Sequence, residues 1–185
     1  PSQTHGIERE YFKLTGATTD HESSTQAEIF RKMRFLKWVH LRHTSFGEEY
    51  PYGKLFASKK YADRFTLSSD GCLSPVEIAA KWHISYFIKE LVRQGVSPLA
   101  AVAAATLNPA RCYGLQTKIG SIKTGKKADL AVFSDLKNFR PEMTLIGGMD
   151  VTGKRVPRFK FPSWSKKTVR INPASRLDIS FKTPE

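Results

Sequence analysis

The sequence predicts an α/β fold with a parallel sheet, followed by a smaller β-rich segment, and three observations lead to this prediction. Between Thr15 and Tyr113, short apolar runs that suit strands alternate with stretches that carry helix-start signals. Strands that alternate with helices are typical of a parallel sheet with crossover helices. Polar side chains follow each expected strand at once. After Gly114 the pattern changes to short strands separated by glycine-containing turns.

The first strand and helix are expected between Gly16 and Leu36. Gly16 to Thr19 suits a short buried strand of small residues. Thr25 and Glu28 have the spacing of a capping box, in which each side chain accepts a hydrogen bond from the other residue's backbone N–H. The apolar face of the helix follows at helical spacing, with Ile29, Met33 and Leu36.

Two further strands are expected in the first half of the chain. Residues Arg34 to Arg42 alternate in polarity, and Trp38 and Val39 favour extended structure. A loop follows, and the segment from Tyr61 leads to a short strand at Phe65 to Ser68.

Serine–proline pairs mark the helices of the second half. Ser74 is the expected N-cap of a helix, Pro75 its first residue, and Glu77 completes a second capping box. One continuous helical stripe ends before the C′ glycine Gly95 and contains Val76, Ala80, Ile84, Phe87, Ile88 and Leu91.

The remaining elements follow from the same signals. Ser97-Pro98 and Asn108-Pro109 each predict a helix start, and Gly114 ends the last helix. Two strand-like runs lie between residues 118 and 136, and two more between residues 142 and 156 around Gly147-Gly148.

Length and composition limit the class of protein. The 185 residues are 40% hydrophobic, which suits a globular core. No apolar run of about 18 residues predicts a membrane span, and no secretory signal is evident. The chain does not begin with Met, so we expect a processed protein or a piece of a longer one. Cys72 and Cys112 form no disulfide motif, and a reducing cytoplasm is the expected location.

The net charge of +13 raises nucleic acid as a partner. Basic, aromatic and proline residues are interleaved from Lys154 to Lys167, a pattern that could grip a phosphate backbone. The same segment equally suits a connector, and the other basic residues are scattered along the chain. Nucleic-acid binding is therefore kept only as a lesser alternative.

Functional side chains are expected where the strands end, because active sites of parallel α/β folds lie at the carboxyl ends of strands. A histidine and an aspartate on one rim suit a divalent metal. Each residue also has a structural interpretation: an Asx turn for Asp20, a buried histidine for His21 and a helix cap for Asp70. His40 and His83 are interpreted as core or surface residues, and His5 is ambiguous. Three strand ends carry candidates: Asp20, His21 and Glu22; Arg42, His43 and Ser45; Ser69 and Asp70.

Several segments resemble a known family. The sequences "VAAATLNPARCYGL", "IGSIKTGKKADLAVFSDL" and "LIGGMDV" resemble the C-terminal part of the amidohydrolase superfamily. The sequences "TGATTDHESS", "VHLRHTSF", "LSSDG" and "DLKNF" are most similar to its adenine deaminase family, and "KKTVRINPASRLDISF" is similar to the start of that family's extra C-terminal domain. The resemblance extends from about Thr15 to Phe181.

The resemblance implies a particular architecture. Three β/α units are too few to close a (β/α)₈ barrel, which takes about 250 residues. We therefore expect the C-terminal part of a metal-dependent hydrolase TIM barrel, strands six to eight, over residues 1–113. Strands of a β-sandwich are expected over residues 114–158. A linker and the start of a truncated C-terminal domain are expected over residues 159–185.

The resemblance also implies roles for five residues. His21 corresponds to a metal ligand, and Asp70 to an aspartate that binds metal and relays protons. Glu22 corresponds to a catalytic-site residue, and Arg42 and Ser45 to substrate-binding residues. The implied cofactor is a divalent metal, Mn, Fe or Zn, binuclear in the parent family. The implied reaction is hydrolytic deamination of adenine to hypoxanthine and ammonia, and the parent family implies a homo-oligomer. A purine is the expected small-molecule partner, nucleic acid stays the lesser alternative, and no membrane contact is expected.

This chain departs from the family pattern in several places. The His-x-His motif of strand one is absent, His43-Thr44 stand where the family has Glu-Gly, and Gly71 stands in place of a second aspartate. We therefore expect an incomplete metal site and no activity from this chain alone. Two alternatives are a non-catalytic relative that serves as an interaction or scaffold module, and an amidohydrolase acting on another cyclic amine or amide.

Overall fold

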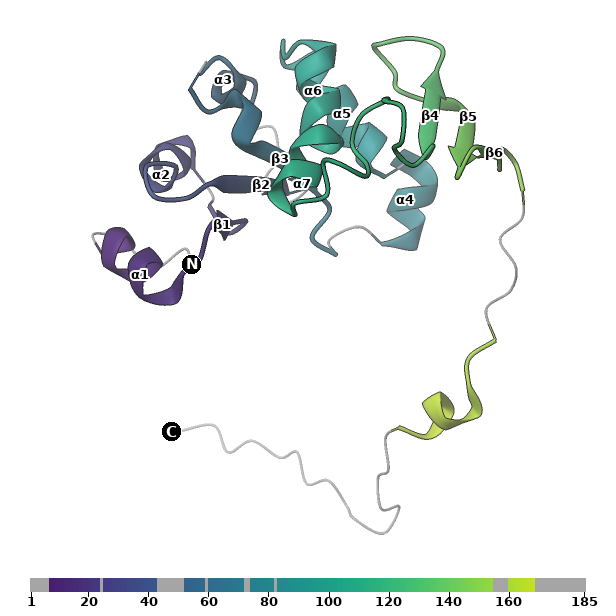
Figure 1. Ribbon diagram of the computed structural model, residues 1–185, viewed down its shortest axis with the longest axis horizontal. Helices are drawn as coiled ribbons and strands as arrows, with labels where there is room; N and C mark the ends of the chain where they lie inside the picture. Colours follow the sequence, from purple (N-terminus) through teal and green to yellow (C-terminus); the bar gives the residue numbers. More distant parts are fainter. Residues whose placement is uncertain are drawn as a thin grey trace, which may run out of the picture. The chain divides into compact units, whose positions relative to one another are not determined.

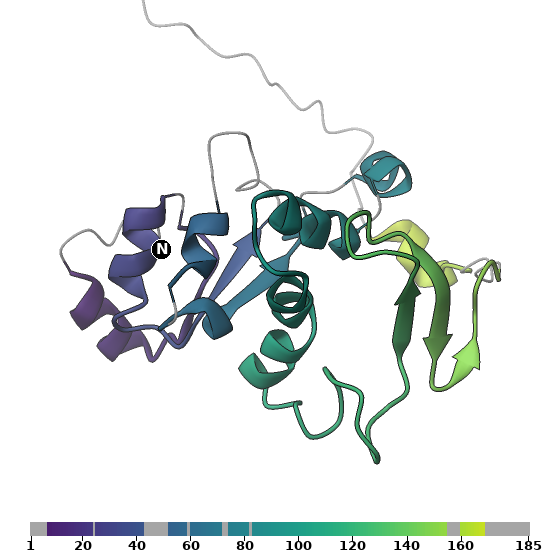
Figure 2. The ribbon, with the colours of Figure 1, turned by 90° about the horizontal axis from the view of Figure 1, so that it is seen from above.

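The computed structural model describes residues 7–23, 25–42, 52–58, 60–71, 74–81, 83–154 and 160–168. Two compact units are present, Pro1–Thr152 and Gly153–Glu185. The first contains two separate three-stranded sheets, one parallel and one antiparallel (Figures 1 and 2). The mixed α/β class and the parallel sheet predicted from the sequence are thus confirmed.

The parallel sheet has the strand order β1-β2-β3. Its strands are β1 (Thr19–Asp20), β2 (Trp38–Arg42) and β3 (Phe65–Ser68). Thr19 pairs with Trp38, and His40 pairs with Thr66. The strand predicted at residues 65–68 is confirmed in full. The first strand lies later than residues 16–19, and the second begins only at Trp38, because residues 33–36 form the turn that ends the preceding helix.

Opposite faces of this sheet differ sharply in chemistry. Successive side chains of a strand point to opposite faces. One face carries the apolar residues, all nearly inaccessible: Val39, Leu41, Phe65 and Leu67. The other face carries mainly polar side chains: Thr19, Trp38, His40, Arg42, Thr66 and Ser68. The register therefore separates a packing face from a face that can carry chemistry.

Helices cover the apolar face, as Figure 1 shows for α2, α3 and α6 above the sheet. The predicted apolar face of α2 is confirmed, since Ile29, Met33 and Leu36 are each 1% exposed. Thr25 is the N-cap of α2 and accepts a hydrogen bond from the backbone N–H of Glu28 at 3.2 Å. The elements of this half are α1 (Glu8–Thr15), α2 (Gln26–Lys32), α3 (Gly53–Phe56) and the 3₁₀ turn η2 (Ala62–Arg64).

The helix predicted as one continuous stripe is two helices, α4 (Pro75–Lys81) and α5 (Ile84–Arg93). The capping box of Ser74 and Glu77 forms as expected, with the Glu77 carboxylate accepting from the Ser74 N–H at 2.9 Å. The backbone of His83 is not helical (φ −96°, ψ −112°), and this break ends the stripe. Val76 is consequently 78% exposed, whereas Phe87 and Leu91 are fully buried.

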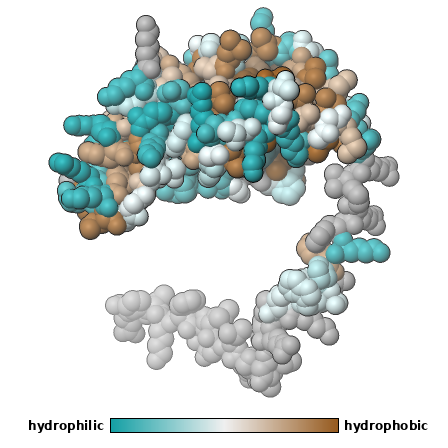
Figure 3. All heavy atoms as spheres, viewed as in Figure 1, coloured by the Kyte–Doolittle hydropathy of each residue, from teal (hydrophilic) through white to brown (hydrophobic). Residues whose placement is uncertain are grey.

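The ends of α5 and α6 follow the predicted signals. Gly95 follows the C-cap of α5 with φ +87°, a conformation that glycine adopts without strain. Ser97 caps α6 (Pro98–Ala105) by accepting from the N–H of Ala100. Hydrophobic atoms reach the surface around α6 in Figure 3, and Leu99 of this helix is 82% exposed.

The predicted start of the last helix is wrong. The helix α7 (Leu107–Cys112) begins one residue before Asn108, with Thr106 at its N-cap position. Asn108 is 2% exposed, and its amide donates a hydrogen bond to the carbonyl of Phe65 at 2.9 Å. Its side chain therefore ties α7 to β3 instead of capping the helix.

The second sheet is an antiparallel meander of β4 (Leu130–Phe133), β5 (Pro141–Ile146) and β6 (Met149–Asp150). The tight turn predicted at Gly147-Gly148 is confirmed. The strand-like run predicted just after Lys118 forms turns, since the N–H groups of Lys118 and Ile119 both bond to the carbonyl of Leu115. In both ribbon views α5, α6 and α7 lie between the two sheets (Figures 1 and 2).

The described part of the second unit contains one 3₁₀ turn, η3 (Ser163–Lys167). Residues 155–159 of the basic segment from Lys154 to Lys167 lie outside the described residues, and its nucleic-acid interpretation stays a prediction. The domain boundaries expected after residues 113 and 158 also stay predictions. Within the described residues, none of the helices combines the length and apolar character that a membrane crossing requires.

Replacing Asn108 with alanine tests the tie between α7 and β3. Asn108→Ala removes a buried hydrogen bond and should lower the free energy of unfolding by about 1–3 kcal/mol. Urea denaturation measures this change. The control Asn138→Ala removes an exposed amide that bonds to Asp135 and should change stability by less than about 0.5 kcal/mol. Equal effects of the two substitutions would contradict the assigned role of Asn108.

Candidate metal-binding site

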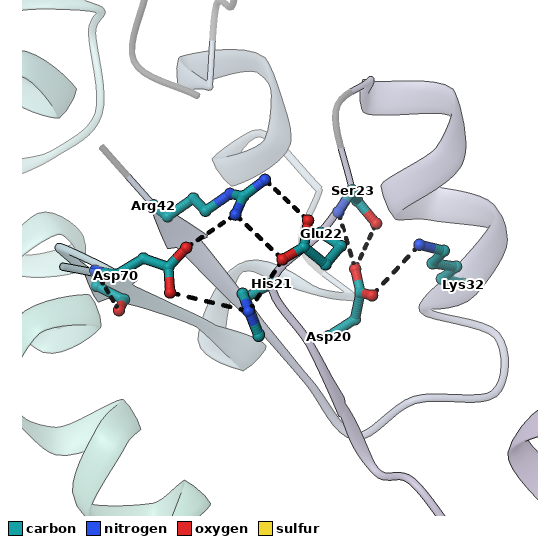
Figure 4. Close-up of polar contacts among 8 residues, drawn as sticks. Asp20, His21, Glu22, Ser23, Lys32, Arg42 and Asp70 are labelled. Atoms are coloured by element: carbon teal, nitrogen blue, oxygen red, sulfur yellow. Dashed lines mark hydrogen bonds and ion pairs between the residues drawn. The ribbon is translucent and has the colours of Figure 1, made fainter. Parts of the chain in front are cut away.

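Four charged or titratable side chains meet at the carboxyl ends of the three parallel strands (Figure 4). His21 and Glu22 follow β1, Arg42 ends β2, and Asp70 lies two residues after β3. The Nε2 atom of His21 lies 3.1 Å from Oε1 of Glu22 and 3.8 Å from Oδ1 of Asp70. The parallel sheet thus brings together residues up to 49 positions apart in the sequence, as the convergence of strand ends predicts.

Arg42 holds the two carboxylates together. Its Nη1 donates to Oδ2 of Asp70 at 2.8 Å and to Oε1 of Glu22 at 3.1 Å. Its Nη2 donates to Oε2 of Glu22 at 3.0 Å, which completes a bidentate pair. Such charge-assisted pairs are directional as well as strong. Arg42 therefore fixes the spacing of Glu22 and Asp70.

Asp70 adopts an unusual backbone conformation. Its φ is +50°, a left-handed value that aspartate tolerates better than most residues. The backbone N–H of Asp70 bonds to the hydroxyl of Ser68 at 3.2 Å, which stabilises the turn. This turn places the carboxylate between Arg42 and His21, with one oxygen toward each.

Electrostatics favour an ionised carboxylate at Asp70. The hydrogen bond from Arg42 holds the pKa of Asp70 below its ordinary value, and positive charge on His21 acts in the same direction. The same hydrogen bond raises the pKa of the Arg42 guanidinium. Both groups are thus charged at neutral pH.

Asp20 does not join this cluster, although the sequence grouped it with His21 and Glu22. Its side chain lies on the helix-covered face, because Asp20 pairs with Val39 and adjacent residues of a strand alternate. There its Oδ2 accepts from the N–H of Ser23 at 3.1 Å and from the Ser23 hydroxyl at 2.5 Å. The alternative interpretation of Asp20 as a turn residue is therefore correct.

Asp20 also binds a buried lysine. The Nζ atom of Lys32 lies 3.3 Å from Oδ1 of Asp20 and 2.8 Å from Oε1 of Glu28, and all three side chains are at most 6% exposed. Burial raises the pKa of Asp20, but the Ser23 hydrogen bond and the charge of Lys32 outweigh burial and keep that pKa below its ordinary value. No sequence pattern indicates a buried role for Lys32, since a helical lysine is usually exposed.

His40 lies in the same cleft as the cluster, which the sequence interpretation as a core or surface histidine missed. The cleft has a volume of about 290 Å³ and is lined by His21, His40, Asp70 and Tyr113, among others. Burial and the charge of His21 lower the pKa of His40, although Asp20 opposes them. The sequence did contain a signal for this placement. His40 lies two residues before Arg42 on the same expected strand, and residues two apart in a strand share a face.

The cluster suits a divalent cation in its donor chemistry. His21, Glu22 and Asp70 each offer one ligand atom, and the three atoms lie within 4.8 Å of one another. One imidazole nitrogen with two carboxylate oxygens is a ligand set that zinc and similar ions accept. Arg42 is the competing cation for the two carboxylates.

Ser45 and His43, the other candidates from the second strand end, lie outside the described residues.

Comparison with known proteins identifies the family. Residues 18–151 match the model of the amidohydrolase family. The chain therefore belongs to the amidohydrolase family, whose members are generally metal-dependent.

Curated relatives refine this assignment. The chain is 32% identical over 172 residues to adenine deaminase of Cenarchaeum symbiosum, with 89% of this chain and 28% of that protein covered. It is 27% identical over 168 residues to adenine deaminase of Archaeoglobus fulgidus, with 91% and 29% covered. The predicted resemblance to adenine deaminases is confirmed. The chain spans about three tenths of the length of these relatives.

Solved structures support the fold alone. Phenylurea hydrolase B superposes with a TM-score of 0.52 at 23% identity, over 78% of this chain and 41% of its own. Molinate hydrolase superposes with a TM-score of 0.54 at 20% identity, over 91% of this chain and 44% of its own.

Removing Lys32 tests the buried ion cluster behind the site. Lys32→Ala leaves Asp20 and Glu28 without their buried cation and should lower the free energy of unfolding by about 3–5 kcal/mol. Chemical denaturation followed by circular dichroism measures the change. Lys13→Ala, on the exposed side of α1, is the control and should cost less than about 0.5 kcal/mol. A loss below 1 kcal/mol for Lys32→Ala would contradict this account.

Proposed function

We propose that this chain is the C-terminal, metal-binding portion of an adenine deaminase-like amidohydrolase. The observation that carries the proposal is the meeting of His21, Glu22 and Asp70 at the carboxyl ends of three parallel strands. In this proposal β1, β2 and β3 are strands six, seven and eight of a TIM barrel. The strands β4, β5 and β6 belong to the β-sandwich beside it. The 32% identity to an adenine deaminase supports adenine as the substrate of the whole protein.

His21 and Asp70 would hold the divalent ion, Mn, Fe or Zn, with Glu22 beside them. When bound, such an ion acts as a Lewis acid that makes water a stronger nucleophile. Its binding requires a neutral imidazole and an ionised carboxylate. The Arg42 contact that lowers the pKa of Asp70 satisfies the second condition.

Asp70 is the proposed proton relay. In the deamination, the oxygen of water bonds to C6 of the purine, and the bond from C6 to the exocyclic nitrogen breaks. One proton of the water passes to Asp70 and then to the departing nitrogen, which leaves as ammonia. The other proton moves from the new hydroxyl to a ring nitrogen as the C6 carbonyl of hypoxanthine forms. An ionised carboxylate can accept this proton, and geometry requires it to lie within hydrogen-bond reach of the water. Glu22 and Arg42 orient Asp70 through the contacts that join the three side chains. Ser45 is proposed as a substrate-binding residue with Arg42.

The chain alone is proposed to be inactive. About seven tenths of each relative's length has no counterpart here, and the strand-one histidines of the family are absent from the sequence. A metal site with few ligands binds weakly. We further propose that the whole enzyme is a cytoplasmic homo-oligomer that acts in purine metabolism.

A non-catalytic relative is the second candidate, and one observation favours it. Arg42 already binds both Glu22 and Asp70 through three hydrogen bonds, so an ion network forms at the strand ends without metal. In that case the strand ends serve the fold, and the chain acts as an interaction or scaffold module. The third candidate is an amidohydrolase that acts on another cyclic amine or amide.

Metal titration separates the first two candidates. The chain should bind Mn²⁺ or Zn²⁺ saturably in isothermal titration calorimetry. His21→Ala should weaken metal binding at least about 10-fold, since loss of a residue that only hydrogen-bonds to a metal ligand already lowers metal affinity about 10–100-fold. His83→Ala is the matched control, because His83 is exposed and outside the cluster. Absence of saturable binding, or equal losses in the two variants, would favour the non-catalytic relative.

Ammonia release tests the reaction. The chain would be co-expressed with the remaining portion of the Cenarchaeum symbiosum adenine deaminase, and the complex supplied with Mn²⁺ and adenine. We expect ammonia from the complex and none from the chain alone. Asp70→Asn should reduce the rate at least about 100-fold through loss of the proton relay, whereas Asp135→Asn, in an exposed turn, should leave it unchanged. Full activity of Asp70→Asn would remove Asp70 from its proposed role.

A further inference from the structure

The cleft beside the charged cluster has a second set of lining residues that the proposed metal site does not use. His40, Thr66, Pro109 and Tyr113 line it together with His21 and Asp70. His40 lies on β2, Thr66 on β3 and Pro109 on α7, and Tyr113 is the C-cap of α7. Both β2 and α7 contact β3. At about 290 Å³ the cleft is near the lower limit for small-molecule sites. A single mono- or bicyclic ring is the size of ligand that it suits.

Two of these side chains present flat rings in parallel. The ring centroids of His40 and Tyr113 are 6.1 Å apart, and the ring planes differ by only 9°. Tyr113 is 66% exposed, so its ring is open to a ligand from solvent. Aromatic rings stack on flat partners with modest preference for the partner's identity. A flat ligand ring is therefore the shape that this pair of side chains recognises.

His40 adds a directional polar group. Its Nδ1 hydrogen-bonds to the hydroxyl of Thr66, which is 1% exposed and therefore fixed in place. Among the described residues, no hydrogen bond forms to the other ring nitrogen, Nε2. Since the Thr66 contact fixes the ring orientation, Nε2 is available to form a hydrogen bond with a ligand atom. A ring nitrogen of a heterocycle is a matching partner for it, as donor or acceptor.

We infer that His40 and Tyr113 form a ring-binding wall, which holds a flat, nitrogen-containing heterocycle beside His21 and Asp70. Tyr113 stacks on the ring, and Nε2 of His40 hydrogen-bonds to one of its nitrogens. The inference rests on the proposed function, because it supplies the substrate-positioning surface of that same site. His40 and Tyr113 are thus binding and positioning residues, whereas the proton transfer remains with Asp70.

Binding of two flat ligands to the 185-residue chain tests the inference, with adenine and indole as probes in equilibrium dialysis. Indole offers a flat surface without the ring-nitrogen acceptors of adenine. Tyr113→Ala should weaken the binding of both about 10-fold, within the range for loss of one stacked aromatic side chain. Tyr113→Phe keeps the ring and should change neither affinity more than about 2-fold.

His40→Phe separates the polar contact from the stacking. It keeps a flat ring but removes both ring nitrogens, Nε2 and the Nδ1 that bonds to Thr66, so adenine affinity should fall about 5–10-fold while indole affinity stays within about 2-fold. Circular dichroism checks that the variant is folded, and equal weakening of both probes in the folded variant would overturn the assigned hydrogen bond. Phe35→Ala is the control for aromatic residues and should leave both affinities unchanged, because Phe35 is 40% exposed and precedes the amino end of β2, opposite the carboxyl ends that form the site.

The outcomes distinguish this inference from the proposed reaction. Absence of saturable adenine binding, or adenine binding that Tyr113→Ala leaves unchanged, would overturn the ring-binding wall. Tyr113-dependent adenine binding supports the wall even when the complemented enzyme releases no ammonia, a result that would overturn only the reaction. Conversely, ammonia release that is insensitive to Tyr113→Ala would overturn the wall and leave the reaction standing.

Discussion

The alternation of side chains along three short parallel strands is the constraint on which the rest of the structure depends. Every second residue of β2 and β3 is apolar and packs under helices, so the residues between them must face the other way. That requirement places His40, Arg42 and Thr66 on one face. A register slip of one residue would bury Arg42 among apolar side chains, at a cost that the fold could not offset.

Charge pairing then divides the polar residues at the strand ends between two environments. On the helix-covered face, Asp20 and Glu28 share Lys32 as a buried cation. On the open face, Glu22 and Asp70 share Arg42 at a partly exposed rim. The first network stabilises the connection between β1 and α2. The second is less constrained, because its side chains are partly exposed to solvent.

The proposed metal site and the ring-binding wall share one structural feature, the orientation of a functional side chain by a neighbouring side chain. In each, one side chain fixes another: Arg42 orients Asp70, and Thr66 orients His40. Preorganised groups need little reordering when a ligand binds, which is why enzyme sites are built on rigid elements. The family assignment, from residues 18–151, agrees with a site at the carboxyl ends of parallel strands.

The sequence by itself determined the α/β class and the strand at residues 65–68. It also determined the caps at Thr25, Ser74 and Ser97 and the strand-end positions of His21, Arg42 and Asp70. Each of these features depends on local spacing or on neighbouring residues. Only the tertiary structure decided the rest. It separated Asp20 from His21, broke the long helix at His83, turned Asn108 into a tie to β3 and brought His40 into the cleft. These outcomes depend on strand register and on partners far along the chain, which local patterns do not encode.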